Sequence, residues 1–262
     1  MAPPVFVVGD VHGHRDVLAR LLRDAGLLDE GERWAGADSI LWLVGDLVDR
    51  GPDGIGAIDL VCRLERESEG AVRCLLGNHE CFLLSVHRFG DRETSFRGAT
   101  FRDVWLANGG VETDLRSLTP EHVEWLLDRP AVAREGNWLL LHADTTAYLR
   151  YGQAVADVNA AISSLLGTGT PEEVDELLEV LCDRMRLMDA SGVDALLQRF
   201  GGTRIVHGHT PIASVREVDP REVTAPFVYA NGRVTNVDHC LFAGGPGFVA
   251  RLDVAPAPDR SS

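Results

Sequence analysis

Apolar and polar positions along the chain predict short buried strands that alternate with helices. Five apolar runs have the length and character of strands: PVFVV (residues 4–8), ILWLV (40–44), AVRCLL (71–76), NWLLL (137–141) and RIV (204–206). Helical spacing of apolar residues follows the first run from Val17 to Ala25, and a second helix is expected from about Gly54 to Glu69. Strands and helices that alternate over short connections predict parallel strands and an α/β layered fold.

Two longer segments, residues 85–129 and about 153–200, are helical and irregular. The second is broken at GTGTP, where Thr170 is expected to cap a helix that begins at Pro171. After Pro211 the pattern predicts short strands, at residues 226–231, 233–238 and 247–254. We expect the two helical segments to form walls or a lid over a site.

Polar motifs rich in Gly, Asp, Asn and His stand at the ends of the five runs. In chain order they are GDVHG (9–13), GDLVDRG (45–51), GNHE (77–80), LLHAD (140–144) and HGHTP (207–211). Ligands in α/β sheets bind beyond the carboxyl ends of the strands. The motifs are therefore expected to assemble one site at one edge of the fold, with their glycines serving tight turns.

The side chains in these motifs are typical of a site for two metal ions. Asp10 and His12, two residues apart in an extended chain, are expected to reach one ion, and Asp46 is expected to bridge it to a second. The second ion would be completed by Asn78, His142 and His209. Imidazoles with carboxylate and amide oxygens suit Mn, Fe or Zn better than Ca or Mg. We expect two divalent ions, first of all Mn²⁺, with Fe and Zn as alternatives.

Phosphoryl transfer is the chemistry that such a site favours. Two ions about 3.5–4 Å apart lower the pKa of a shared water and clamp a phosphoryl group for in-line attack. His79, oriented by Asp49, is the expected general acid for the departing oxygen. Arg50 is expected to bind the phosphate through its fork of donors.

Composition narrows the class of protein further. A chain of 262 residues can bury one large core, and we expect one domain over residues 1–254 with a disordered tail over 255–262. The formal charge of −15 disfavours a nucleic-acid surface, and no apolar stretch approaches a membrane span. The chain start lacks a basic leader region, and the five cysteines suggest buried thiols in a reducing compartment, so a cytoplasmic location is expected.

The five motifs together resemble the signatures of calcineurin-like metallophosphoesterases, over roughly Val5 to Val254. Within that superfamily the chain is similar to the phosphoprotein phosphatase branch, which includes small bacterial and phage Ser/Thr phosphatases and symmetrical diadenosine tetraphosphate hydrolases. The resemblance implies a pair of β-sheets sandwiched by helices. It also implies the metal ligands and acid given above, phosphate contacts from Arg50 and Asn78, and a second phosphate-binding arginine. Arg184 is the best candidate for the latter, with Arg186 close behind.

Four positions depart from the patterns of the family or of one of its branches. Leu76 replaces the arginine that usually precedes GNHE in eukaryotic-type protein phosphatases, and Glu80 stands where the hydrolases usually have Asp. Asp144 follows His-Ala where the family often has glycine, and it could repel an anionic substrate or bond to a neighbouring group. Pro211 occupies the place of the last histidine of the phosphodiesterase motif GHxH, which favours a phosphomonoesterase.

These observations favour a Ser/Thr protein phosphatase whose substrate is a phosphorylated protein or a small phosphoester. The alternatives are a symmetrical dinucleoside polyphosphate hydrolase, a small-molecule phosphomonoesterase and, remotely, a non-catalytic scaffold. A nuclease is disfavoured by the acidic charge, and neither nucleic acid nor membrane is an expected partner. The oligomeric state stays open.

The remaining candidate residues are expected to have structural roles. His14 is expected at the rim of the site, and His207 either beside the ligands or as a satisfied strand-end residue. The other three histidines are expected on the surface or in loops: His87, His122 and His239. Cys81 is expected as a buried small side chain, and the tryptophans Trp105 and Trp125 as core residues.

Overall fold

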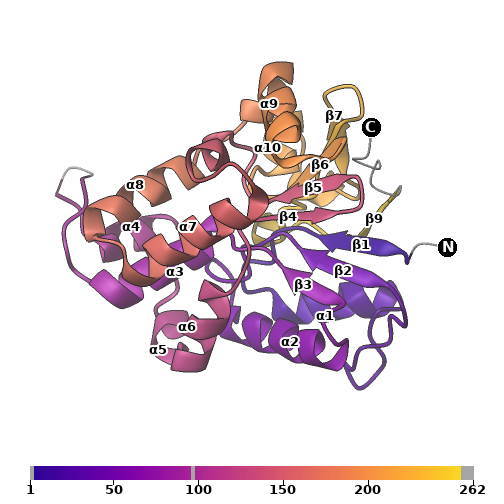
Figure 1. The fold of residues 1–262 in the computed structure, drawn as a ribbon. Coiled ribbons are helices and arrows are strands. Elements are labelled where there is room, and N and C mark those ends of the chain that lie inside the picture. The colour runs from indigo at the N-terminus through magenta and orange to yellow at the C-terminus, as the bar shows by residue number, and fades with distance from the viewer. Residues whose placement is uncertain (1–2, 96–97, 255–262) are drawn as a thin grey trace.

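The computed structural model describes residues 3–95 and 98–254, which form two sheets flanked by helices (Figure 1). The first sheet has the order β3-β2-β1-β9. Its strands are β1 (Val5–Val8), β2 (Ile40–Leu43), β3 (Val72–Cys74) and β9 (Ala250–Leu252). The first three are parallel, as predicted, and β9 pairs antiparallel with β1.

The second sheet has the order β4-β5-β6-β8-β7. Its strands are β4 (Val132–Glu135), β5 (Trp138–Leu141), β6 (Arg204–His207), β7 (Phe227–Tyr229) and β8 (Val234–Asn236). The central strands β5, β6 and β8 are parallel, and β4 and β7 close the edges antiparallel. The carboxyl ends of the parallel strands of both sheets carry the motif residues.

The two sheets pack face to face through alternating residues of their strands. Val5 and Val7 of β1 belong to one buried apolar cluster with Trp138 and Leu140 of β5. Because side chains alternate along a strand, Val8 of β1 joins the other large cluster, which lies under the helices. This alternation produces the predicted α/β/β/α architecture.

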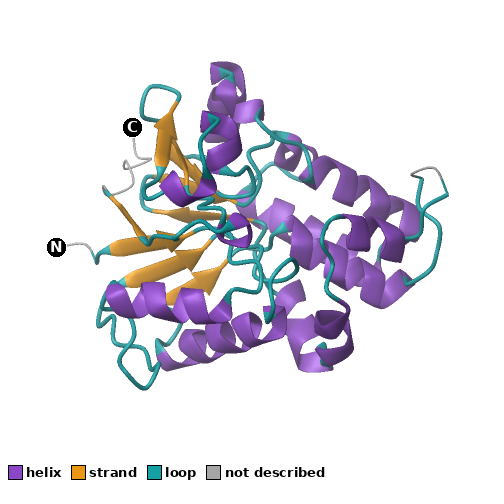
Figure 2. Ribbon diagram, turned by 180° about the vertical axis from the view of Figure 1, so that it is seen from behind, coloured by secondary structure: helices purple, strands orange, loops and turns teal. Residues whose placement is uncertain are grey.

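The helices fall into three groups (Figures 1 and 2). The first sheet is covered by α1 (Arg15–Asp24) and α2 (Gly54–Glu67), and α9 (Ala190–Phe200) packs against β6 of the second. A helical region lies to one side of both sheets. It comprises α3 (Asn78–Phe89), α4 (Phe101–Ala107), α5 (Glu112–Ser117), α6 (Pro120–Leu127), α7 (Val155–Thr168) and α8 (Pro171–Leu181). A short helix, α10 (Ile212–Arg216), follows the last motif. The 3-10 turns are Ala147–Arg150, Arg186–Met188, Pro220–Glu222 and Leu241–Ala243.

Most of the predicted elements are found, with two additions. The side chain of Thr170 caps α8 by accepting from the amide of Glu173, as expected. The edge strand β4 and the helix α10 were not predicted. The expected tail over residues 255–262 lies outside the described part of the chain. Among the described residues, no helix has both the length and the apolar character needed to cross a membrane.

Candidate metal centre

The six expected metal ligands meet at the shared carboxyl edge of the two sheets. The first sheet contributes Asp10 and His12 after β1, Asp46 after β2 and Asn78 at the start of α3. The second contributes two histidines, His142 after β5 and His209 after β6. All six side chains are buried, with at most 2% of their surface exposed.

Four of these side chains form a compact group of ligand atoms. The Oδ1 atom of Asn78 lies 2.9 Å from Nε2 of His142 and 2.8 Å from Nδ1 of His209. The same Nε2 of His142 lies 3.2 Å from Oδ1 of Asp46. Atoms that share an ion at about 2.1 Å lie about 3 Å apart, so these separations fit one bound cation.

The other group surrounds His12. Its Nε2 atom lies 3.6 Å from Oδ2 of Asp46 and 3.9 Å from Oδ2 of Asp10. Asp46 therefore turns one carboxylate oxygen to each group, as a bridging ligand would. His79 also belongs here, because His12, Asp46 and His79 form one of two buried sets whose ligand atoms all lie within 4.8 Å of one another. The second set is Asp46, His142 and His209.

Backbone carbonyls orient two of the imidazoles for metal binding. Nδ1 of His142 lies 2.8 Å from the carbonyl oxygen of Val44, and Nδ1 of His12 lies 3.1 Å from that of Val48. Since a carbonyl only accepts, each Nδ1 carries the hydrogen, and Nε2 is the nitrogen left to face a metal ion. A histidine that binds a metal commonly has such a partner on its other nitrogen.

The electrostatics of the site also fit cations. Burial and the nearby carboxylates Asp238 and Asp46 raise the pKa of Asp10 well above its usual range. Burial opposes ionisation of Asp46 as well, yet His142 and His79 hold its pKa well below the usual range. Crowded buried carboxylates and imidazoles are a donor set that divalent transition ions would satisfy.

His79 and Asp49 form a buried hydrogen-bonded pair beside the ligands. Nδ1 of His79 lies 2.8 Å from Oδ2 of Asp49, and both side chains are buried. The indole nitrogen of Trp105 donates to the same carboxylate at 2.9 Å, so this predicted core residue also orients Asp49. Arg50 reaches into the site between two rings, with its guanidinium nitrogens 3.1 Å from Nε2 of His12 and 3.0 Å from Nε2 of His79.

The backbone of the motifs adopts left-handed conformations that few residues other than glycine take up. Five site residues have positive φ angles: His12 (46°), Asp46 (53°), Asp49 (66°), Arg50 (63°) and His209 (65°). The expectation that Asp10 and His12 share one side of an extended chain is therefore wrong, because a turn at His12 directs its ring. Gly45 has φ 99°, and a Cβ there would lie 2.6 Å from the amide nitrogen of Gly77. Such conformations are typical of functional sites held by their surroundings.

Glu80 is a buried carboxylate whose contacts were not anticipated. Its oxygens accept from the amides of Asp46 and Gly77, both at 2.8 Å, and from that of Leu47 at 2.7 Å. Glu80 therefore holds the turn that carries the bridging Asp46 against the start of α3. The sequence signal was the glutamate at the third position of the helix, where it can bond back to the preceding amide.

The two candidate arginines of the helical region lie differently. The guanidinium of Arg184 donates to the backbone carbonyl of His209, so Arg184 reaches the edge of the metal centre. Arg186 pairs with Asp183 and is mostly exposed. Asp144, whose role the sequence left open, accepts from the Thr210 hydroxyl at 2.5 Å and from the amide of Met185 at 2.9 Å. Asp144 thus anchors the segment that carries Arg184.

The remaining histidines have structural roles, but His122 is not the surface or loop residue expected, because it lies in α6 with only 13% of its side chain exposed. His207 is a satisfied strand-end residue, 2.8 Å from the hydroxyl of Tyr229. His14 is half-buried, His87 is exposed and His122 bonds to Asp59 at 3.0 Å. His239 lies in a loop but is fully buried, and burial together with His14 lowers its pKa to about 3.

The tryptophans and cysteines lie near the expected places. Trp105 is buried, and Trp125 is only half-buried, because its indole nitrogen reaches Glu65 at 2.7 Å. All five cysteines are free; Cys74, Cys81 and Cys240 are buried, and Cys62 and Cys182 are partly exposed.

Comparison with known proteins identifies the family. The sequence model of the calcineurin-like phosphoesterase family matches residues 3–244, so the chain belongs to that family. Its buried His and Asp side chains fit the metal chemistry of this family, and the two buried sets of ligands are consistent with a dinuclear site.

The chain is similar to enzymes of two kinds. The symmetrical bis(5'-nucleosyl)-tetraphosphatase of Legionella pneumophila (strain Lens) is 31% identical over 166 residues, which cover 63% of this chain and 52% of the relative. Serine/threonine-protein phosphatase 1 of Salmonella typhimurium is 27% identical over 219 residues, 79% of each chain. The chain thus spans about half the length of the tetraphosphatases it matches.

A solved structure shares the fold. The cold-active protein-tyrosine phosphatase of a Shewanella species superposes with a TM-score of 0.70 at 22% identity, over 96% of this chain and 76% of its own. At this identity the similarity concerns the fold alone.

Proposed function

We propose that this protein is a phosphomonoesterase that removes phosphate from serine or threonine side chains of proteins. The proposal rests chiefly on one observation: a buried His79–Asp49 pair, 2.8 Å apart, lies beside two sets of metal ligands that share Asp46. Together they offer a water-activating centre and a proton donor on a single site.

The roles follow from the positions of the side chains. Bound in the two sets, divalent ions would supply an activated water and neutralise charge on the phosphoryl oxygens. Asn78 and Arg50 would hold the phosphate, and Arg184 would bind it from the side of the second sheet. His79 would give its proton to the departing oxygen, with Asp49 stabilising the imidazolium. Mn²⁺ is the proposed ion, because its preferences match imidazole, carboxylate and amide ligands.

Two observations favour a protein phosphatase over a dinucleotide hydrolase. The similarity to the Salmonella phosphatase extends over most of both chains, whereas that to the tetraphosphatases leaves about half of those proteins unmatched. Glu80 also agrees with the phosphatase form of the GNHE motif. The symmetrical tetraphosphatase activity of the other relatives is the second candidate function.

A competition among substrates tests the proposal. The purified protein with Mn²⁺ would be assayed on p-nitrophenyl phosphate, on a phosphoserine peptide and on diadenosine tetraphosphate. We expect kcat/KM for the peptide to exceed that for the dinucleotide. A preference for the dinucleotide over the peptide would reverse the assignment.

A further inference from the structure

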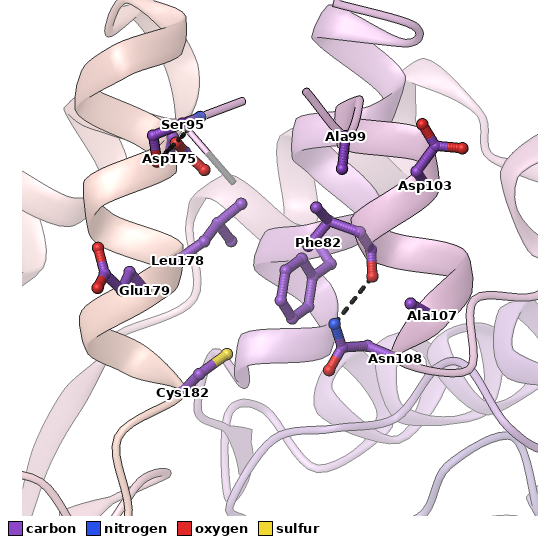
Figure 3. Close-up of a pocket in the computed structure, with 11 residues that line it drawn as sticks. Phe82, Ser95, Ala99, Asp103, Ala107, Asn108, Asp175, Leu178, Glu179 and Cys182 are labelled. Atoms are coloured by element: carbon purple, nitrogen blue, oxygen red, sulfur yellow. Dashed lines mark hydrogen bonds between the residues drawn. The ribbon is translucent and has the colours of Figure 1, made fainter. Parts of the chain in front are cut away.

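A cavity of about 810 Å³ opens beside the metal centre, between α4 and α8 (Figure 3). Its volume is in the range of ligand pockets. Phe82 of α3 and Leu178 of α8 project into it, and Ala107 lies at the end of α4. The walls are therefore formed by the helical region, where sequence spacing gave no information about a substrate.

Three residues that line the cavity touch residues of the site. The amide nitrogen of the Asn78 side chain lies 3.6 Å from Sγ of Cys182, and Nε of Arg50 lies 3.5 Å from the carbonyl oxygen of Asn108. The ring of Phe82 packs edge-on against His79, with 6.0 Å between centroids. The cavity is therefore adjacent to the proposed acid and to the proposed phosphate-binding groups.

The position of the cavity indicates which part of the substrate it would bind. The proposed acid His79 gives its proton to the departing oxygen, so whatever is attached to that oxygen lies on the His79 side of the phosphate. Phe82 and Asn108 place the cavity on this side, because they contact His79 and Arg50. The cavity is therefore positioned to receive the leaving group.

The cavity combines an apolar floor with an acidic rim. Asp103, Asp175 and Glu179 stand at its edge, and its described lining contains no arginine or histidine. A second hollow of about 440 Å³ shares Asp175 and Glu179 and adds three further carboxylates, Glu93, Glu172 and Glu176. The negative charge thus continues away from the metal centre along α8.

The negative charge of the cavity rim and the second hollow favours some leaving groups over others. A nucleoside diphosphate carries several negative charges and would be repelled by the rim. A peptide with arginine or lysine near its phosphorylated residue would pair with the carboxylates while the apolar stems of those side chains pack on the floor. An apolar and acidic cleft is therefore complementary to a basic peptide.

We propose that the cavity between α4 and α8 binds the residues that flank the phosphorylated serine or threonine, and that it selects peptides with basic flanking residues. This inference rests on the proposed phosphatase function and adds the class of substrate that the site prefers.

The experiment measures kcat/KM for three phosphoserine peptides that differ only in their flanking residues, arginine, alanine or glutamate. Diadenosine tetraphosphate and p-nitrophenyl phosphate serve as the other substrates. The double variant Glu176→Arg, Glu179→Arg reverses one exposed charge of the rim, Glu179, and one of the adjoining hollow, Glu176. Its matched control is Glu30→Arg, Asp38→Arg, two exposed residues in the loop before β2.

The wild type should prefer the arginine peptide to the glutamate peptide. The rim variant should lower kcat/KM for the arginine peptide by about tenfold, as expected for two surface charge pairs. It should leave p-nitrophenyl phosphate unaffected and improve the glutamate peptide, and the control variant should change none of these values.

Two other outcomes separate a failure of this inference from a failure of the proposed function. If the peptides are hydrolysed but the rim variant leaves the arginine-to-glutamate ratio unchanged, the cavity does not select basic peptides, while the phosphatase function stands. If diadenosine tetraphosphate is preferred to every peptide, the proposed function fails and the inference with it.

Discussion

The strand-end loops and the helices around the cavity meet at one site, but they differ in backbone conformation and in the exposure of their side chains. The loops place buried side chains by means of a strained backbone, with His12, Asp46 and Asp49 all at positive φ. Such conformations cost about 1–3 kcal/mol each and persist only where the surroundings enforce them. In contrast, α4 and α8 are regular helices begun by ordinary threonine caps, and they present exposed side chains such as Ala107 and Glu179.

This difference separates the chemistry of the site from its selectivity. In the loops, almost any change of side chain or of glycine moves a ligand or a backbone amide. On the helices, exposed residues can change without disturbing the metal centre. We therefore expect substitutions of the metal ligands in the loops to abolish turnover of all substrates, and substitutions on the helices to change the ranking of substrates.

The largest effect is expected from His79→Asn. Loss of the proton donor should lower kcat/KM on a phosphoserine peptide by about 10²–10⁴-fold. The loss should be much smaller on p-nitrophenyl phosphate, because p-nitrophenolate departs without a proton. Steady-state kinetics would be combined with elemental analysis. An unchanged metal content supports the acid role, whereas loss of an ion would make His79 a ligand.

Glu80→Gln tests how the loop around Asp46 is held. The amide NH₂ of glutamine would face backbone N–H donors on one side, so either the amides of Asp46 and Gly77 or that of Leu47 would lose an acceptor. We expect Mn²⁺ affinity to fall by about 10–100-fold, as for other residues that orient metal ligands. Metal titration with circular dichroism as a check of folding measures this. Unaltered affinity would remove Glu80 from the support of the site, and Glu69→Gln on the surface is the control.

Asp144→Ala probes the link between the second sheet and the helical region. The variant should lower kcat/KM by about tenfold, mainly through KM, because the segment that carries Arg184 loses its acceptor at Met185. The same substitution in an Arg184→Ala background should have little further effect. Fully additive losses in this double-mutant cycle would mean that Asp144 does not act through Arg184.

The smallest effect is expected from Ala107→Trp, which places a large side chain in the cavity. KM for a peptide should rise by about fivefold, near 1 kcal/mol, while p-nitrophenyl phosphate is unaffected. The control is Leu106→Trp, an exposed neighbour on the same helix that does not line the cavity. Equal effects of both variants on the peptide would argue against binding in the cavity.

The parts of this fold that were predictable from sequence are those whose local chemistry determines their position. Long apolar runs followed by Asp, Asn or His identified the strand ends, and Thr170-Pro171 identified the start of α8. β4 was missed because VARE is short and ends in charged residues, and its pairing depends on the turn at Gly136 (φ 56°) that returns the chain as β5.

The parts that could not be predicted depend on contacts between distant segments. His239 has no neighbour in sequence that explains its burial; it packs edge-on against Phe248 with 5.3 Å between ring centroids. The bond from Trp105 to Asp49 joins residues 56 positions apart, and the cavity arises where α3, α4 and α8 come together. Spacing within one segment carries no information about such contacts.

Elemental analysis and anomalous diffraction of active protein test the central claim most directly. The account predicts two transition-metal ions per chain, one among Asp10, His12 and Asp46 and the other among Asp46, Asn78, His142 and His209. Active protein without a bound transition ion, or with its ions away from these side chains, would contradict it.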